Sequence, residues 1–464
     1  MNAKDFLRLG VPLGEATRRA GDFVSRFLLS GGDKARLEEE LKAILADPAR
    51  YLEDPLRGEL ARAIAGAPPP PRAEPVKYRQ WGEGLEPEAV MQMEKACLLP
   101  VAVAGALMPD AHVGYGLPIG GVLATENAVI PYAVGVDIAC RMKMTVLDIP
   151  LRELERHPER LTRAIEAETR FGVGATFKNR RQHEVMDADW NVSPVTQQNK
   201  DRAWAQLGTS GSGNHFVEFG IFTAHDRIGG LEPGAYLALL SHSGSRGTGA
   251  AVCDYYSKLA FSRFRGLPSE LKRLAWLPLD SQEGQEYWAA MELMGRYAAA
   301  NHALIHRHIA AHLGAEVLLD VENHHNFAWK ERHVIGGQER EVIVHRKGAT
   351  PAGKGVLGII PGSMASPGFL VSGKGHPESL NSASHGAGRV MSRTQATKTF
   401  DWKRVNAYLR EKGVTLISAG LDEVPMVYKN IHEVMAAQHD LVTILGQFDP
   451  KLVKMAPHGE RPED

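Results

Sequence analysis

The pattern of apolar and polar positions changes near residue 75. In the first part, residues 33–45 predict an amphipathic helix, with Asp33 as its N-cap after two glycines. The apolar positions of this helix recur at helical spacing: Leu37, Leu41, Ile44 and Leu45. A second helix is predicted over about residues 55–66, and Pro68–Pro71 then predict a stiff linker. We therefore expect residues 1–75 to form a small helical N-terminal appendage with a Pro-rich linker.

From residue 76 to residue 464, short β-rich apolar runs alternate with Gly-rich turns and longer helices. Strands are predicted over residues 122–124, 142–147 and 236–240. Helices are predicted over about 283–313 and 399–412, and no internal repeat is present. This alternation predicts a single large domain of the α+β (mixed α/β) class, with the chemistry carried by loops.

Composition narrows the class of protein. Of 464 residues, 44% are hydrophobic and 23% charged, which is typical of a globular chain. No run of 18 apolar residues predicts a membrane span, and the N-terminus does not resemble a signal peptide. Three cysteines fit a reducing compartment, so we expect a cytoplasmic protein. A net charge of -1 excludes a globally basic nucleic-acid binder but allows a local basic groove.

The chain has 47 glycines and 19 histidines, and glycines cluster around several of the histidines. Five short segments set a His or Asp among Gly, Ser or Asn: residues 135–140, 211–215, 241–247, 322–326 and 384–389. Glycine lets the backbone approach a ligand closely. One such segment would carry little weight, but five in one chain predict a site.

Asp137 and Cys140 are three residues apart, which places both side chains on one side of a tight turn. A carboxylate and a thiolate joined by several imidazoles form a transition-metal ligand set. Two metals that share the thiolate would suit phosphoryl or nucleotidyl transfer. Cys97 and Cys253 lie in apolar or helical surroundings, and we interpret them as inert buried thiols.

Other patterns are weaker. The pairs His302/His306 and His308/His312 have zinc-binding spacing, but we interpret them as part of an ordinary amphipathic helix. Residues 368–375 match the G-x-x-x-x-G-K part of a phosphate-binding loop, but Gly375 stands where that loop needs Ser or Thr. The apolar residues of this segment predict a strand instead. Local basic residues suit a polyanion. They are Lys178, Arg180, Arg181, Arg246, His345, Arg346, Lys347 and Arg389.

Seven motifs, in order, resemble the RtcB family of GTP-dependent RNA ligases, and the likeness runs from about residue 80 to 455. The motifs are residues 108–116, Asp137 with Cys140, 207–215, 242–247, 345–350, 361–364 and 385–389. Three positions depart from the family pattern. Ser384 stands where Cys is common, His324 replaces a common Ser, and Met455 with a polar tail follows Lys454 where the family usually ends in Lys-Gly.

The resemblance implies an RtcB-like fold and a site for two Mn²⁺ ions. By motif match the ligands are Asp137, Cys140, His215, His242 and His325, with Cys140 bridging. The resemblance implies that His385 is the nucleophile, which attacks the α-phosphate of GTP and carries GMP as a phosphoramidate. The implied nucleotide contacts are Asn214, Glu218, Asn326, Pro361, Gly362, Ser363, Met364, Gly386, Ala387, Gly388 and Lys454.

The implied reaction joins RNA 3′-phosphate or 2′,3′-cyclic phosphate ends to 5′-hydroxyl ends, as in tRNA splicing or RNA repair. GMP moves first to the 3′-phosphate, and the 5′-hydroxyl then displaces it. The expected partners are RNA and GTP, no membrane is expected, and the need for an activating helper protein stays open. Two alternatives are a metal-dependent phosphoesterase and a non-catalytic RNA-binding relative, but His385 and Asn214 favour the ligase.

Overall fold

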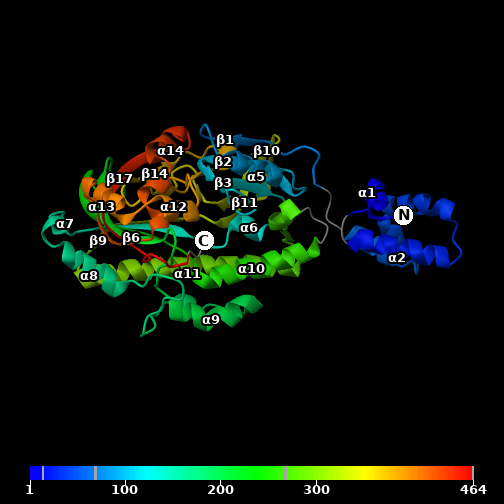
Figure 1. Cartoon of the computed structure of the whole chain (residues 1–464), viewed down its shortest axis with the longest axis horizontal. Coiled ribbons are helices and arrows are strands. Elements are labelled where there is room, and N and C mark those ends of the chain that lie inside the picture. The colour runs from blue at the N-terminus through cyan, green and yellow to red at the C-terminus, as the bar shows by residue number, and fades with distance from the viewer. Residues whose placement is uncertain (13–14, 67–70, 265–268, 462–464) are drawn as a thin grey trace.

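The computed structural model describes residues 1–12, 15–66, 71–264 and 269–461 (Figure 1). The helices are α1 (Ala3–Arg8), α2 (Glu15–Leu29), α3 (Leu37–Ala46), α4 (Gly58–Ala65), α5 (Pro87–Cys97), α6 (Pro131–Val134), α7 (Glu153–Arg156), α8 (Pro158–Glu168), α9 (Pro194–Gln206), α10 (Arg246–Arg263), α11 (Gln282–Leu313), α12 (Arg393–Thr399), α13 (Trp402–Glu411) and α14 (Ile431–Ala437).

The strands are β1 (Tyr78–Gln80), β2 (Ala102–His112), β3 (Ile119–Thr125), β4 (Ala128–Val129), β5 (Arg141–Leu147), β6 (Phe216–Ala224), β7 (Gly234–Ser243), β8 (Leu277–Pro278), β9 (Val317–His324), β10 (Phe327–Ile335), β11 (Gln338–Lys347), β12 (Ala349–Pro351), β13 (Leu357–Ile360), β14 (Gly368–Gly373), β15 (Ser382–Ser384), β16 (Thr415–Ser418) and β17 (Val442–Met455). The predicted strands lie in β3, β5 and β7, and the predicted helices correspond to α11 and α13.

Helices α1–α4 form a group with its own apolar core, which includes Phe6, Phe23, Leu41 and Leu60. The prediction over residues 33–45 is confirmed as a 3-10 turn followed by α3, and the Asp33 carboxylate accepts a hydrogen bond from the Ala35 N–H. The second predicted helix is α4, which begins three residues later than expected. Of the four prolines in the predicted linker, those at 68–70 lie outside the described residues.

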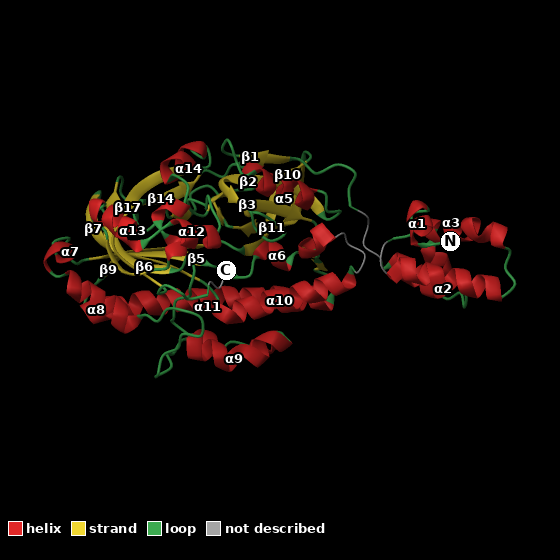
Figure 2. Cartoon of the chain, viewed as in Figure 1, coloured by secondary structure: helices red, strands yellow, loops and turns green. Residues whose placement is uncertain are grey.

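Two large sheets dominate the rest of the fold, beside the two-stranded sheets β12-β15 and β4-β8. One has the strand order β1-β2-β3-β11-β10, and the other has the order β13-β14-β17-β6-β7-β5-β9, with β16 paired to β17. Helices α8 and α11 pack on one face of the larger sheet through a cluster that includes Phe219, Leu239 and Ile305. Helix α10 lies alongside α11, with α9 outside them (Figure 2). The predicted mixed α/β class is confirmed.

Among the described helices, none combines the length and the apolar composition needed to cross a membrane.

Candidate active site

A cavity of about 740 Å³ lies where the two sheets meet. Its wall takes His112 and Lys347 from the five-stranded sheet, and Phe216, Glu218 and His242 from the larger one. The fold therefore brings together motifs that lie far apart in the sequence.

The register of the larger sheet determines which side chains meet in this cavity. Strands β6, β7, β5 and β9 are adjacent, and antiparallel pairing puts the beginning of β5 and β6 beside the ends of β7 and β9. Arg141 pairs with both Ser243 and His324. Cys140, directly before Arg141, and His325, directly after His324, therefore meet at the same edge. Phe216 pairs with His242, which brings His215 to this edge as well.

The five predicted metal ligands converge at this edge. The Cys140 thiol sulphur lies 3.4 Å from His215 Nε2 and 3.1 Å from His242 Nε2. His215 Nε2 lies 3.1 Å from the Asp137 carboxylate, and His242 Nε2 lies 3.2 Å from His325 Nε2. Two buried groups result, Asp137–Cys140–His215 and Cys140–His242–His325, and Cys140 belongs to both.

This donor set fits metal ions. His242 Nδ1 lies 3.1 Å from the Asn214 carbonyl and donates its proton there, so Nε2 carries a lone pair toward the cluster. When Cys140 is a thiolate and His325 keeps its own lone pair on Nε2, three acceptors meet at this point. Acceptors that crowd together in a buried space need a positive species between them.

The pKa values in the cluster favour the metal-binding protonation states. Burial lowers the pKa of His242 to about 3 and the pKa of His325 well below its usual range, so both imidazoles are neutral. Burial acts to raise the pKa of Asp137, but the hydrogen bond and charge of His215 outweigh it and hold that pKa below its ordinary value. Metal ligation requires neutral imidazoles and an ionised carboxylate.

His385 lies beside this cluster, and its ring centre is 4.8 Å from that of His325. It follows β15 and is half-buried. The fully buried Asp110 carboxylate accepts hydrogen bonds from His385 Nδ1, at 2.7 Å, and from its backbone N–H, at 3.2 Å. Nδ1 is thereby the protonated nitrogen, and Nε2 keeps a lone pair. Asp110 lies in the motif at residues 108–116, for which the sequence alone predicted no catalytic role.

The predicted nucleotide residues occupy the same cavity, except Lys454. Those that line it are Asn214, Glu218, Asn326, Pro361, Gly362, Ser363, Met364, Gly386, Ala387 and Gly388. The Asn214 side-chain oxygen is buried without a partner, which suits a ligand donor. The Asn326 side chain links two segments of the site: its Nδ2 donates to the Asp137 carbonyl, and its Oδ1 accepts from the Gly348 N–H. Burial raises the pKa of Glu218 well above its ordinary value.

Lys454 does not belong to this wall. Its strand neighbours Val453 and Met455 line the cavity, whereas Lys454 pairs with Val217 on the face that α8 and α11 cover. Its ammonium lies 5.9 Å from the ring centre of Phe171. Because a one-residue step along a strand reverses the face, Lys454 lies on the opposite side from Val453 and Met455, and its contact with the nucleotide stays a prediction.

The structure also separates the two neighbouring histidines 324 and 325. His324 packs at 5.1 Å from the rings of Phe327 and Trp329, whereas His325 joins the cluster. The helical pairs have other contacts: His302 and His306 share the Ser241 hydroxyl, and His308 and His312 lie beside Glu168. Burial raises the pKa of Cys97 and of Cys253 to about 12, which agrees with inert thiols.

Of the predicted basic residues, Lys347 and Arg389 line the cavity. Burial lowers the pKa of Lys347 to about 7. The other arginines have different roles: Arg246 donates to the Gly172 carbonyl, Arg346 pairs with Glu331, and Arg180 pairs with Asp201.

The comparisons with known proteins agree with this geometry. The sequence profile of one family, described as tRNA-splicing ligase RtcB, matches residues 92–193 and 176–455. The RNA-splicing ligase RtcB of Escherichia coli (strain K12) is 33% identical over 414 residues, which covers 80% of this chain and 95% of the relative. The tRNA-splicing ligase RtcB of Nanoarchaeum equitans is 31% identical over 440 residues, which covers 79% of this chain and 91% of the relative. Matches of this extent show that the chain belongs to the RtcB family.

Proposed function

We propose that this protein is a cytoplasmic RNA ligase that uses GTP and two Mn²⁺ ions. It joins RNA 3′-phosphate or 2′,3′-cyclic phosphate ends to 5′-hydroxyl ends through a GMP–His385 intermediate, in tRNA splicing or RNA repair. The observation that carries the proposal is the His385–Asp110 pair beside the five-ligand cluster. The ligase names of the relatives support the same reaction.

The metals would be held in two groups that share a thiolate. Asp137, Cys140 and His215 would hold one ion, and Cys140, His242 and His325 the other. When bound, the two cations would neutralise the triphosphate and the charge that develops on the departing pyrophosphate. Asn214 positions His242 through its carbonyl, and its side-chain oxygen is buried without a hydrogen-bond partner.

Asp110 prepares the nucleophile. Because its carboxylate accepts the Nδ1 proton, His385 Nε2 presents its lone pair to the α-phosphate of GTP. A P–N bond forms, and the bond to pyrophosphate breaks. An oxygen of the RNA 3′-phosphate then attacks the same phosphorus and releases His385. Finally the RNA 5′-hydroxyl attacks the activated 3′-phosphate, loses its proton and displaces GMP.

Glycine in the segment after His385 allows the loop that carries this nucleophile to lie close to Asp110. Gly388 has a φ of +77°, and a Cβ there would lie 2.1 Å from the Asp110 carbonyl oxygen. A side chain at this position would push the nucleophile's loop away from the residue that orients it. Arg389, which pairs with Glu423, and Lys347 supply N–H donors on the cavity wall, where phosphates would lie.

The test is covalent labelling. The full-length protein is incubated with Mn²⁺ and GTP radiolabelled at the α-phosphate, and then run on a denaturing gel. We expect one GMP on His385, bound by a linkage that is labile in acid and stable in alkali. His385→Ala should abolish the label and keep the fold and the metal content, and the exposed His439→Ala should label normally. Label that persists in His385→Ala, or that maps to a lysine, would refute the assignment. Phosphoester cleavage without any label would favour the phosphoesterase alternative.

A further inference from the structure

Tyr115 is a large aromatic residue that lines the cavity and yet is 54% exposed. It lies in the loop between β2 and β3 and belongs to neither of the two donor groups described above. Single exposed aromatic residues are common and need no function. Three further observations distinguish this one: its backbone is fixed, a cation lies on its ring, and the loop lies close to the nucleophile.

The loop that carries Tyr115 is fastened at several points. Gln92 accepts from the Gly114 N–H at 3.0 Å and donates to the Gly114 carbonyl at 2.8 Å. Glu86 accepts from the Val113 N–H at 3.0 Å, and Lys347 Nζ donates to the Tyr115 carbonyl at 2.5 Å. An exposed ring on a backbone held in this way costs little conformational entropy when a ligand binds.

A cation covers the ring. The Arg273 guanidinium carbon lies 4.3 Å from the ring centre of Tyr115 and 5.8 Å from that of Tyr132. Within the described part of the chain, no ion pair joins Arg273 to a carboxylate. Arg273 is exposed, so its charge stays available to an anion that approaches the ring.

The loop also lies close to the reacting group. Lys347, which holds the Tyr115 carbonyl, is followed by Gly348, where a Cβ would lie 3.2 Å from His385 Cε1. Two consecutive residues therefore lie beside both groups: Lys347 contacts the Tyr115 carbonyl, and Gly348 leaves no room for a side chain next to His385. Tyr115 and His385 also line the same cavity.

We infer that the Tyr115 ring, backed by Arg273, is the platform on which the terminal nucleobase of an RNA end stacks. Single-stranded nucleic acids bind proteins through aromatic rings beside positive charge, and such stacking tolerates any base because every base has a π-face. The inference rests on the proposed function, since it names the part of the RNA that the ligase site holds. The chemistry is shared by the 3′-phosphate end and the 5′-hydroxyl end, and the test separates them.

The first measurement is binding without catalysis. Two short single-stranded RNAs carry the fluorescent base 2-aminopurine, one beside a 3′-phosphate and one at a 5′-hydroxyl end, and a third carries it internally. In full-length protein with His385→Ala, we expect one terminal probe to be quenched and the internal probe to be unaffected. Adding Tyr115→Ala should remove the quenching and weaken binding about tenfold, and Tyr115→Phe should retain both. Equal quenching with and without the Tyr115 ring would overturn the inference.

The second measurement is kinetic. Tyr115→Ala with His385 intact should raise the KM for the RNA end about tenfold while GMP labelling proceeds at the wild-type rate. An abasic nucleotide at the end that was quenched should remove the difference between variant and wild type. The matched control is Tyr255→Ala, since Tyr255 is 43% exposed on α10 and outside the cavity. A wild-type protein without GMP label would count against the proposed function, whereas normal labelling with an unchanged KM would count against the platform alone.

Discussion

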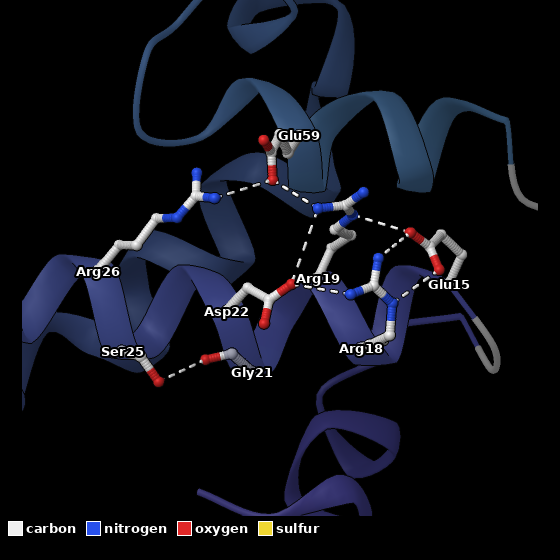
Figure 3. A network of polar contacts seen from close by, with 8 residues as sticks. All are labelled: Glu15, Arg18, Arg19, Gly21, Asp22, Ser25, Arg26 and Glu59. Carbon is white, nitrogen blue, oxygen red and sulfur yellow. Dashed lines mark hydrogen bonds and ion pairs between the residues drawn. The ribbon is translucent and has the colours of Figure 1, made fainter.

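The N-terminal helices and the active site use polar side chains in opposite ways. In the helices, Arg18, Arg19 and Arg26 form a network with Glu15, Asp22 and Glu59 on the surface (Figure 3). These side chains are 30–56% exposed, and their partners come mostly from the same helix. In the candidate active site, the five predicted ligands are buried and come from four separate segments of the chain.

The two regions therefore differ in what their polar side chains contribute to stability. Exposed ion pairs contribute about 0–1 kcal/mol each, and each pair can be lost without loss of the fold. Buried polar atoms without partners, such as His215 Nδ1 and His325 Nδ1, cost about 1–3 kcal/mol each. A region that keeps such costly groups together is kept for its chemistry, whereas the helical network is replaceable. The comparison therefore predicts large effects in one region and small effects in the other.

The largest effect is expected from Cys140→Ser. Because Cys140 belongs to both donor groups, its loss should disturb both metal positions and reduce GMP transfer below detection. Metal content can be measured by mass spectrometry after dialysis against Mn²⁺. Cys253→Ser is the matched control, since that thiol is equally buried and lies outside the cluster. If the Cys140 variant retains two ions per chain, the bridging role is wrong.

Asp110→Asn should slow GMP transfer by about 10²-fold or more, because an amide no longer fixes the tautomer of His385. Metal content and thermal stability should stay close to wild type, which separates orientation of the nucleophile from loss of the cluster. Stopped labelling reactions measure the rate. A variant as fast as wild type would show that Asp110 does not orient His385.

Gly244→Ala and Gly230→Ala form a matched pair. At Gly244 a Cβ would lie 2.0 Å from the Asp137 carboxylate oxygen, whereas at Gly230 nothing lies within 4 Å. The first change should displace a ligand and weaken Mn²⁺ binding about 10–100-fold, as loss of a ligand's support does. The second should leave it unchanged. Isothermal titration with Mn²⁺ measures both, and equal affinities would mean that the buried site is more adaptable than proposed.

The buried Lys347 should make the stability of the protein depend on pH, whereas an exposed lysine should not. Burial lowers its pKa to about 7, whereas an unfolded lysine has a pKa of about 10.4. Between these values the unfolded chain binds more protons, so Lys347 makes the free energy of unfolding rise with pH, by at most about 1.4 kcal/mol per pH unit. Lys347→Met should remove this slope in urea unfolding between pH 7 and about 10. The exposed Lys412→Met should keep it, and a slope that persists in Lys347→Met would contradict the assignment.

The smallest effects are expected in the N-terminal helices. Glu59→Ala removes the shared partner of Arg19 and Arg26 and should lower the free energy of unfolding by about 1 kcal/mol or less.

A truncation tests the N-terminal helices as a whole. Arg72 donates to the Leu99, Pro100 and Ala102 carbonyls, so a deletion should end before it. Removal of residues 1–70 should leave GMP transfer intact and alter RNA choice or stability. A folded truncation that no longer labels His385 would show that the two regions cooperate.

The sequence determined the local elements well. Helical spacing located α3 and α11, and apolar runs located β3, β5 and β7, because these patterns depend only on neighbours along the chain. The Gly-flanked motifs also marked the five candidate ligands that the structure brings together. Asp110 shows where this reasoning stopped: its motif was visible, but its partner His385 lies 275 residues away.

Tertiary structure alone decided which of these residues meet and which way each one faces. The register of β5 against β7 and β9 puts Cys140 between His242 and His325, and it selects His325 rather than His324 for the cluster. The same alternation along β17 turns Lys454 away from the cavity. A strand reverses its facing side at every residue, so motifs can name the candidates, but only the pairing of strands fixes their direction.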